Sequence, residues 1–143
     1  MAIVKLNKQE LKVNDLLREW MIDYKAVHLA KVKQWGSDMD KFACVLTNRR
    51  NGETETFDFF TGLGHRINNN VKLPQAASLL HSLLLDSQAA EEPFEFWCDN
   101  FGYDTDSMKA RKTYDACIAI GEQLKKVLSA EQITQLREVL EDY

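Results

Sequence analysis

The sequence predicts an α+β fold, in which a small N-terminal antiparallel sheet of about three strands is covered by a helical C-terminal half. Two observations carry this prediction: strand-like segments flank an Asn51-Gly52 pair, and apolar residues after Pro74 recur at helical spacing. The length of 143 residues predicts one domain, 1–143, made of a helix and sheet over 1–66 and a helical part over 67–143.

The first two elements follow from spacing. From Asn7 to Trp20 the apolar residues recur mostly at helical intervals, which predicts a short amphipathic helix. From Met21 to Lys33 apolar and charged residues nearly alternate, which predicts a strand. Gly36 and Ser37 are expected to end that strand.

Asn51-Gly52 predicts a hairpin between strands Lys41–Arg50 and Glu53–Thr61, because a type I′ turn needs positive φ at both central positions. The two-residue turn would set Arg50 opposite Glu53 and, further along, Leu46 opposite Phe57 and Cys44 opposite Phe59. One face of the hairpin would then be apolar and buried, formed by Phe42, Cys44, Leu46, Phe57 and Phe59.

The C-terminal half predicts four helices. Pro74 suits the first turn of one helix, and Pro93 opens a shorter one over Phe94–Phe101 that Gly102 would close. Asp104, Thr105, Asp106 and Ser107 offer N-caps for a helix over Ser107–Leu128, and Ser129 with Gln132 forms a capping box for the last. The residues expected to face inward are Ala76, Leu79, Leu80, Leu83 and Leu84, then Tyr114, Cys117, Ile118, Leu124 and Leu128, and finally Ile133, Leu136, Val139 and Leu140.

Composition excludes several classes of protein. No apolar run approaches the ~20 residues of a membrane span, and three scattered cysteines fit a reducing compartment better than a disulfide scaffold. The three histidines share no ligand spacing with one another or with the cysteines, so we expect no metal site. Phosphate-loop, dinucleotide and hydrolase motifs are missing as well, so we expect no cofactor and no enzymatic activity.

The net charge of −4 hides an uneven distribution: residues 1–50 carry a net +4, residues 51–106 a net −8 and residues 107–143 none. Seven acidic residues follow Leu73 with no Lys or Arg before Met108, namely Asp86, Glu91, Glu92, Glu95, Asp99, Asp104 and Asp106. Such a patch can steer a basic partner. The simpler alternative is a solvated acidic face that only aids solubility.

Aromatic residues gather in the same stretch: Phe94, Phe96, Trp97, Phe101, Tyr103 and Tyr114. Aromatic clusters are usually core, but Tyr and Trp beside acidic residues are also typical of interface hot spots. The residues predicted to bind a partner are Glu91, Glu92, Glu95, Asp99, Tyr103, Asp104 and Asp106.

Two further motifs have competing interpretations. Two glycines, His65 and Arg66 at the end of a predicted strand, over Gly62–Arg66, could hold an anion or small ligand, or be a simple strand exit with exposed polar side chains. The oxygens of Asp99–Asp106 are typical of a calcium loop, but the spacing and the terminal Glu of that loop are missing. A helix junction with several caps explains them better.

Two runs carry a resemblance to a widespread group of small phage and prophage proteins: F-x-F-W-C-D-N-F-G-Y-D-T-D-S over Phe94–Ser107 and F-x-F-F-T-G-L-G-H-R over Phe57–Arg66. Pro74, Tyr114 and Cys117 belong to the same pattern. The resemblance covers about Phe57 to Tyr143, and its specific part is W-C-x-x-F-G-Y-D-x-D-S. It implies an accessory protein with no assigned enzymatic activity, in a size class that includes inhibitors of bacterial defence such as anti-CRISPR proteins.

We therefore expect a stoichiometric binding protein in the host bacterial cytoplasm, whose acidic aromatic face binds a host protein complex, such as a nucleic-acid-binding defence effector. Direct binding to nucleic acid or to a membrane is not expected. The alternatives are a small-ligand, nucleic-acid or enzymatic module at Gly62–Arg66, or a phage DNA-metabolism accessory without catalysis. The sequence leaves the oligomeric state open.

Overall fold

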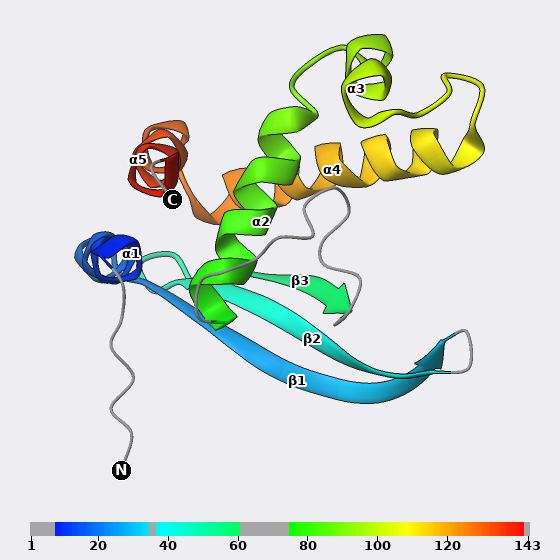
Figure 1. Cartoon of the computed structure of the whole chain (residues 1–143). Coiled ribbons are helices and arrows are strands. Elements are labelled where there is room, and N and C mark those ends of the chain that lie inside the picture. Colours follow the sequence, from blue (N-terminus) through cyan, green and yellow to red (C-terminus); the bar gives the residue numbers. More distant parts are fainter. Residues whose placement is uncertain (1–7, 35–36, 61–74, 142–143) are drawn as a thin grey trace.

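A computed structural model describes residues 8–34, 37–60 and 75–141, and Figure 1 gives its arrangement. The elements are, in order, α1 (Lys8–Glu19), β1 (Ile22–Gln34), β2 (Ser37–Asn48), β3 (Thr54–Phe60), α2 (Gln75–Ala89), α3 (Phe94–Phe101), α4 (Met108–Val127) and α5 (Ala130–Glu141). The strands form one antiparallel sheet in the order β1-β2-β3. The predicted α+β class is confirmed. Pro74 and Gly62–Arg66 lie outside the described residues.

The helices lie over one face of the sheet, and α3 is the element furthest from it (Figure 1). α2 crosses above the strands. The N-terminal end of α4 lies beside α3, and its C-terminal end lies over the sheet. α3 packs on α4. One end of α4 therefore helps to cover the sheet, and its other end supports α3.

The β2–β3 hairpin exists, but its predicted register and turn are wrong. Cys44 pairs with Phe57 and Leu46 with Glu55, two residues away from the prediction. Gly52 has a positive φ of 77°, whereas Asn51 does not, so the turn is not type I′. Instead the Gly52 N–H donates to the Asn48 carbonyl at 2.8 Å, and Asn48 N–H donates to the Glu53 carbonyl at 2.8 Å. These bonds close a wider loop over 49–52.

The buried face of the hairpin is correct in spite of the register error. A two-residue shift moves the pairing but leaves each side chain on its own face, because side chains alternate with a period of two. Cys44, Leu46 and Phe57 are buried, and Phe42 is half-buried against the same core. The side chain of Phe59 lies outside the described residues.

This main core joins the sheet to four helices. It includes Leu17 of α1, Leu83 of α2, Leu124 of α4 and Leu136 of α5. One inward prediction is wrong: Ile118 is 37% exposed, and Ile120 is buried instead. Each residue advances a helix by about 100°, so Ile118 points well away from the buried stripe of Cys117, Ile120 and Leu124.

The helix caps agree with the sequence. Gly102 ends α3 in the left-handed conformation with a φ of 72°, a conformation that glycine adopts without a steric penalty. Ser129 and Gln132 form the reciprocal capping box, since Ser129 N–H donates to Gln132 Oε1 at 2.9 Å and Gln132 N–H donates to Ser129 Oγ at 3.1 Å.

Of the four candidate N-caps for α4, Ser107 is the residue that caps it, because its Oγ accepts from Ala110 N–H at 3.2 Å. Ser107→Ala is expected to lower the free energy of unfolding by about 1 kcal/mol, since the Ala110 N–H loses its side-chain acceptor. Thr105→Ala is the control, because Thr105 is exposed and outside the cap, and it should change stability by less than about 0.5 kcal/mol. Urea titration measures both; an equal loss in the two variants would contradict this assignment.

Tyr24 connects the sheet to α1, and its ionisation should lower the free energy of unfolding at alkaline pH. Its hydroxyl donates to Asn14 Oδ1. Burial raises the pKa of Tyr24 to about 12, with the Glu10 and Cys44 charges adding to the rise. Because the folded-state pKa lies above the ordinary value of about 10, the protonated phenol stabilises the fold below pH 10, and that stability is lost between about pH 10 and 12. Urea titrations across this range should show the loss, and Tyr24→Phe should reduce it; an unchanged loss in Tyr24→Phe would assign it to other groups.

Candidate functional site

The candidate site is built on a second, smaller core that holds α3 against α4. This core is formed by Ala90, Trp97, Cys98, Ala110, Tyr114 and Cys117. Trp97 is fully buried at its centre. Most of the aromatic residues that the sequence gathers here therefore have a packing role, as the simpler interpretation predicts.

Four aromatic rings surround Trp97. It stacks on Tyr103 with ring centroids 5.1 Å apart and planes 4° apart, and on Phe94 at 6.4 Å and 15°. Phe101 and Tyr114 meet the same indole at tilted angles, each with centroids 5.4 Å away. Aromatic pairs at these separations contribute beyond simple area burial, so α3 is firmly held although it has only eight residues.

Two hydrogen bonds fix the segments on either side of α3. The Tyr114 hydroxyl of α4 donates to the Glu92 carbonyl at 2.8 Å, just before α3 begins. At the other end, Tyr103 N–H donates to the Cys98 carbonyl at 2.9 Å. The first bond ties the segment before α3 to α4, and the second closes the C-terminal end of α3 on its own loop, so the outer surface of α3 is presented in a defined orientation.

The outer surface carries the predicted acidic residues. Glu91, Glu92, Glu95, Asp99, Asp104 and Asp106 are all exposed. Glu95 and Asp99 are four residues apart and share one side of α3, with Phe96 next to them. The Phe96 ring is 61% exposed. We call Glu92, Glu95, Phe96, Asp99, Asp104 and Asp106 the acidic face; it combines carboxylates with one prominent exposed aromatic ring.

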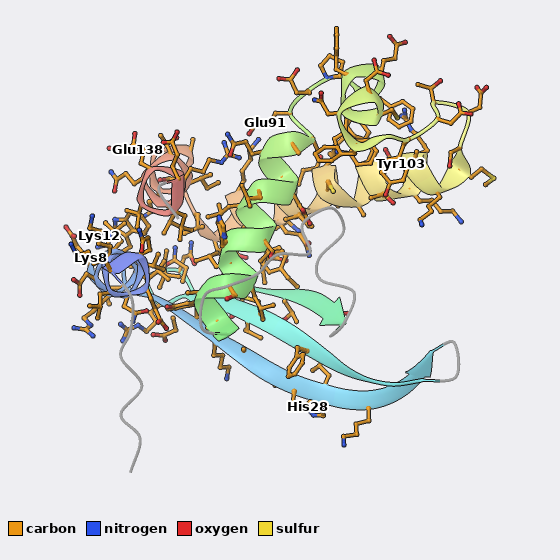
Figure 2. The ribbon with its side chains drawn as sticks, in the orientation of Figure 1. Lys8, Lys12, His28, Glu91, Tyr103 and Glu138 are labelled. Carbon is orange, nitrogen blue, oxygen red and sulfur yellow. The ribbon has the colours of Figure 1, made fainter. Side chains whose placement is uncertain are left out.

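The structure changes the role of three residues in the acidic stretch. Asp86 is fully buried on α2, so it does not belong to the surface. Tyr103, predicted to bind a partner, is half-buried because it stacks on Trp97, and it lies in the loop between α3 and α4 (Figure 2). Glu91 is exposed, but its Oε1 accepts from Arg137 Nη2 of α5 at 2.9 Å.

A basic edge, which the sequence analysis missed, borders the acidic face. Lys109, Arg111 and Lys112 are exposed on the first turns of α4. Arg111 lies with its guanidinium carbon 4.8 Å from the Phe94 ring centroid, and its Nε is 3.5 Å from Asp115 Oδ1. The signal was present in the sequence, because these cations directly follow Met108, but only the fold shows that they lie beside α3.

The cysteine of α3 is not placed as a nucleophile. Cys98 is buried on the inner side of α3, and burial raises the pKa of its thiol, with the Asp99 and Asp104 carboxylates adding to the rise and Arg111 opposing it. Such a thiol stays protonated and is a poor nucleophile. In the part of the chain that the structure describes, no three His, Cys, Asp or Glu side chains are grouped so as to hold a metal ion.

His65 and Arg66, the predicted anion-binding pair, lie outside the described residues. Among the helices that are described, none is long and apolar enough to cross a membrane.

No family model, curated protein or solved structure matched the chain. The resemblance to small phage proteins therefore stays a prediction.

Proposed function

We propose that this protein acts by stoichiometric binding, and that the acidic face on α3 docks against a basic surface of a partner protein. The observation that carries the proposal is Phe96, a large aromatic ring 61% exposed among carboxylates on a helix that Trp97 holds in place. Exposed aromatic residues on rigid supports are typical anchors of protein interfaces, because little conformational entropy is lost when they bind.

The charges around Phe96 define the chemistry of the partner. Glu95 and Asp99 lie on the same side of α3 as Phe96, and Asp104 and Asp106 follow in the adjoining loop. Carboxylates around an apolar anchor suit a surface in which Lys or Arg side chains surround an apolar pocket. Proteins that hold phosphates present such cations, so the acidic face would compete with a nucleic acid for the same channel.

The charge of the acidic face supports steering of a basic partner toward α3. Lys8 and Lys12 on α1 lie at the opposite end of the molecule from Tyr103 beside α3 (Figure 2), and α1 carries three cations and three carboxylates, so it has no net charge. A partner with a basic surface would be attracted to the acidic face without a comparable attraction at α1, which raises the rate of productive encounter. Because the sequence resembles phage proteins, the partner we propose is a host protein complex that binds nucleic acid, in the first place a defence system.

The proposal is tested by affinity capture from a bacterial lysate, with and without nuclease treatment. Three proteins are compared: the wild type, the face variant Asp99→Asn/Asp104→Asn/Asp106→Asn, and the control variant Asp15→Asn/Glu19→Gln/Glu53→Gln. The Asp104 Oδ1 accepts from Asp106 N–H at 3.0 Å. An amide at this position keeps an oxygen that can accept the same bond, so the loop should retain its local structure.

The two variants remove the same number of negative charges, but the control charges are exposed on α1 and in the β2–β3 loop. We expect a nuclease-resistant protein complex with the wild type and the control variant, and its loss with the face variant. Capture of nucleic acid alone, or equal capture of one protein by both variants, would contradict the proposal.

A further inference from the structure

The ring of Phe96 lies on the outer side of α3 and is 61% exposed. Among the described residues it contacts no other aromatic ring and no cation, unlike Phe94, which stacks on Trp97 and lies under the Arg111 guanidinium. Phe96 also cannot turn inward without unpacking α3, because its neighbours Trp97 and Cys98 fill the side that faces α4. The ring is therefore open to a group of a partner.

Two carboxylates lie beside this ring. Asp99 follows Phe96 by three residues and Glu95 by four, so it neighbours both on the surface of α3. Side chains on a helix lean toward its N-terminus, which brings the Asp99 carboxylate back toward the turn that carries Phe96. Glu95 and Asp99 are exposed, and neither forms an ion pair with a residue that the structure describes. An open ring beside unpaired carboxylates suits a cation that can use both.

The chain already holds one cation in this manner. The guanidinium carbon of Arg111 lies 4.8 Å from the ring centroid of Phe94, and its Nε is 3.5 Å from Asp115 Oδ1. A planar guanidinium can make both contacts at once, because its face stacks on the ring while its N–H groups point outward in the plane. Phe96 with Asp99 presents the same two partners, a ring and a carboxylate, on the outer side of α3.

Lysine uses such a pair of partners less well than arginine. Its ammonium is a compact and strongly hydrated charge, so it loses more hydration on reaching a ring, and it has no planar fork that matches a carboxylate. Carboxylates alone attract both cations, because Coulomb attraction depends only on charge and distance. The ring beside them is what favours the guanidinium.

We propose that Phe96, Asp99 and Glu95 bind an arginine side chain of the partner protein. Its guanidinium stacks on the Phe96 ring and donates to the Asp99 carboxylate, and the charge of Glu95 adds to the attraction. Charge complementarity selects a cation for this surface, and the exposed ring selects arginine among the cations. This inference rests on the function proposed above and names the residue type that the acidic face recognises.

The test compares two peptides that differ only in the cation, acetyl-Gly-Arg-Gly-amide and acetyl-Gly-Lys-Gly-amide. Each is titrated at low salt into the full chain labelled with ¹⁵N, because salt screens contacts between exposed charges. We expect the Arg peptide to bind about fivefold more tightly than the Lys peptide, with the largest amide shifts on α3. Equal affinities, shifts concentrated away from α3, or no shifts with either peptide would overturn the proposal.

Variants separate the contribution of the ring from that of the charge. Phe96→Leu keeps an apolar side chain but removes the ring, so the preference for the Arg peptide should disappear while the Lys peptide binds as before. Asp99→Asn should weaken both peptides, whereas Asp15→Asn, which removes an exposed carboxylate of α1, should weaken neither. An Arg preference that survives in Phe96→Leu would contradict the assignment, as would equal effects of Asp99→Asn and Asp15→Asn.

Failure of this inference can be told apart from failure of the proposed function. If the two peptides bind equally while the partner is still captured through the acidic face, the arginine preference is wrong and the docking surface stands. If the Arg peptide is preferred but the face variant still captures the partner, the arginine site stands and the proposed docking surface is wrong.

Discussion

Trp97→Ala is expected to lower the free energy of unfolding by about 3–5 kcal/mol and to release α3 from α4. The physical reason is that four aromatic rings contact a fully buried indole, and no other residue of α3 except Cys98 is buried. The main core around Leu83 and Leu124 does not include Trp97, so the sheet and its covering helices should stay folded. Hydrogen exchange should show faster exchange confined to α3 and the adjoining loop.

Trp97→Phe is the graded control. It keeps an aromatic ring and removes the indole Nε1–H, which is buried without a hydrogen-bond partner among the described residues. Leaving such a donor unsatisfied costs about 1–3 kcal/mol, so removing it offsets part of the stability lost through the cavity that the smaller Phe ring leaves. The loss of stability should therefore be well below that of Trp97→Ala. Equal losses, or exchange that spreads through the whole chain, would contradict the view that α3 is held by its own small core.

The second large effect concerns binding rather than stability. Phe96→Ala is expected to weaken binding to the captured partner by at least about 2 kcal/mol, roughly a 30-fold rise in Kd. Because the Phe96 ring is mostly exposed, its removal should change the free energy of unfolding by less than about 0.5 kcal/mol. Isothermal titration with the purified partner and urea titration of the variant measure the two quantities separately.

Leu11→Ala is the matched control for Phe96→Ala. Leu11 is an exposed apolar residue, 48% accessible, but it lies on α1, away from the acidic face. We expect its replacement to leave Kd unchanged within a factor of about two, as is usual for residues outside an interface. If both replacements weaken binding equally, general surface hydrophobicity rather than the α3 anchor would explain the interaction.

Local signals in the sequence predicted most of the fold. Gly102 and the capping box at Ser129 and Gln132 are where the residue types require them, because these caps depend only on residues within a few positions of one another. The predicted register of the β2–β3 hairpin was wrong because the loop depends on a residue outside the Asn51-Gly52 pair. Asn48 accepts from the loop with both its backbone carbonyl and its side chain, and the Asn51-Gly52 pair does not reveal this.

The candidate site was predicted only in part. The sequence identified the acidic residues, but it could not separate buried Asp86 from its exposed neighbours, because that depends on how α2 packs. It also could not show that Phe96, at 61%, and Phe101, at 40%, are the exposed aromatic residues of α3. Phe96 and Trp97 are adjacent, and the burial of Trp97 follows from contacts with Tyr114 of α4, which is distant in the sequence.

The most direct test of the central claim is the Kd of the purified partner for the face variant and for the control variant, measured side by side at one salt concentration. The account predicts a rise of about 100-fold or more for Asp99→Asn/Asp104→Asn/Asp106→Asn, because desolvated charge pairs are lost, and a change within about threefold for Asp15→Asn/Glu19→Gln/Glu53→Gln. Equal Kd values for the two variants would contradict the claim that the acidic face on α3 is the binding surface.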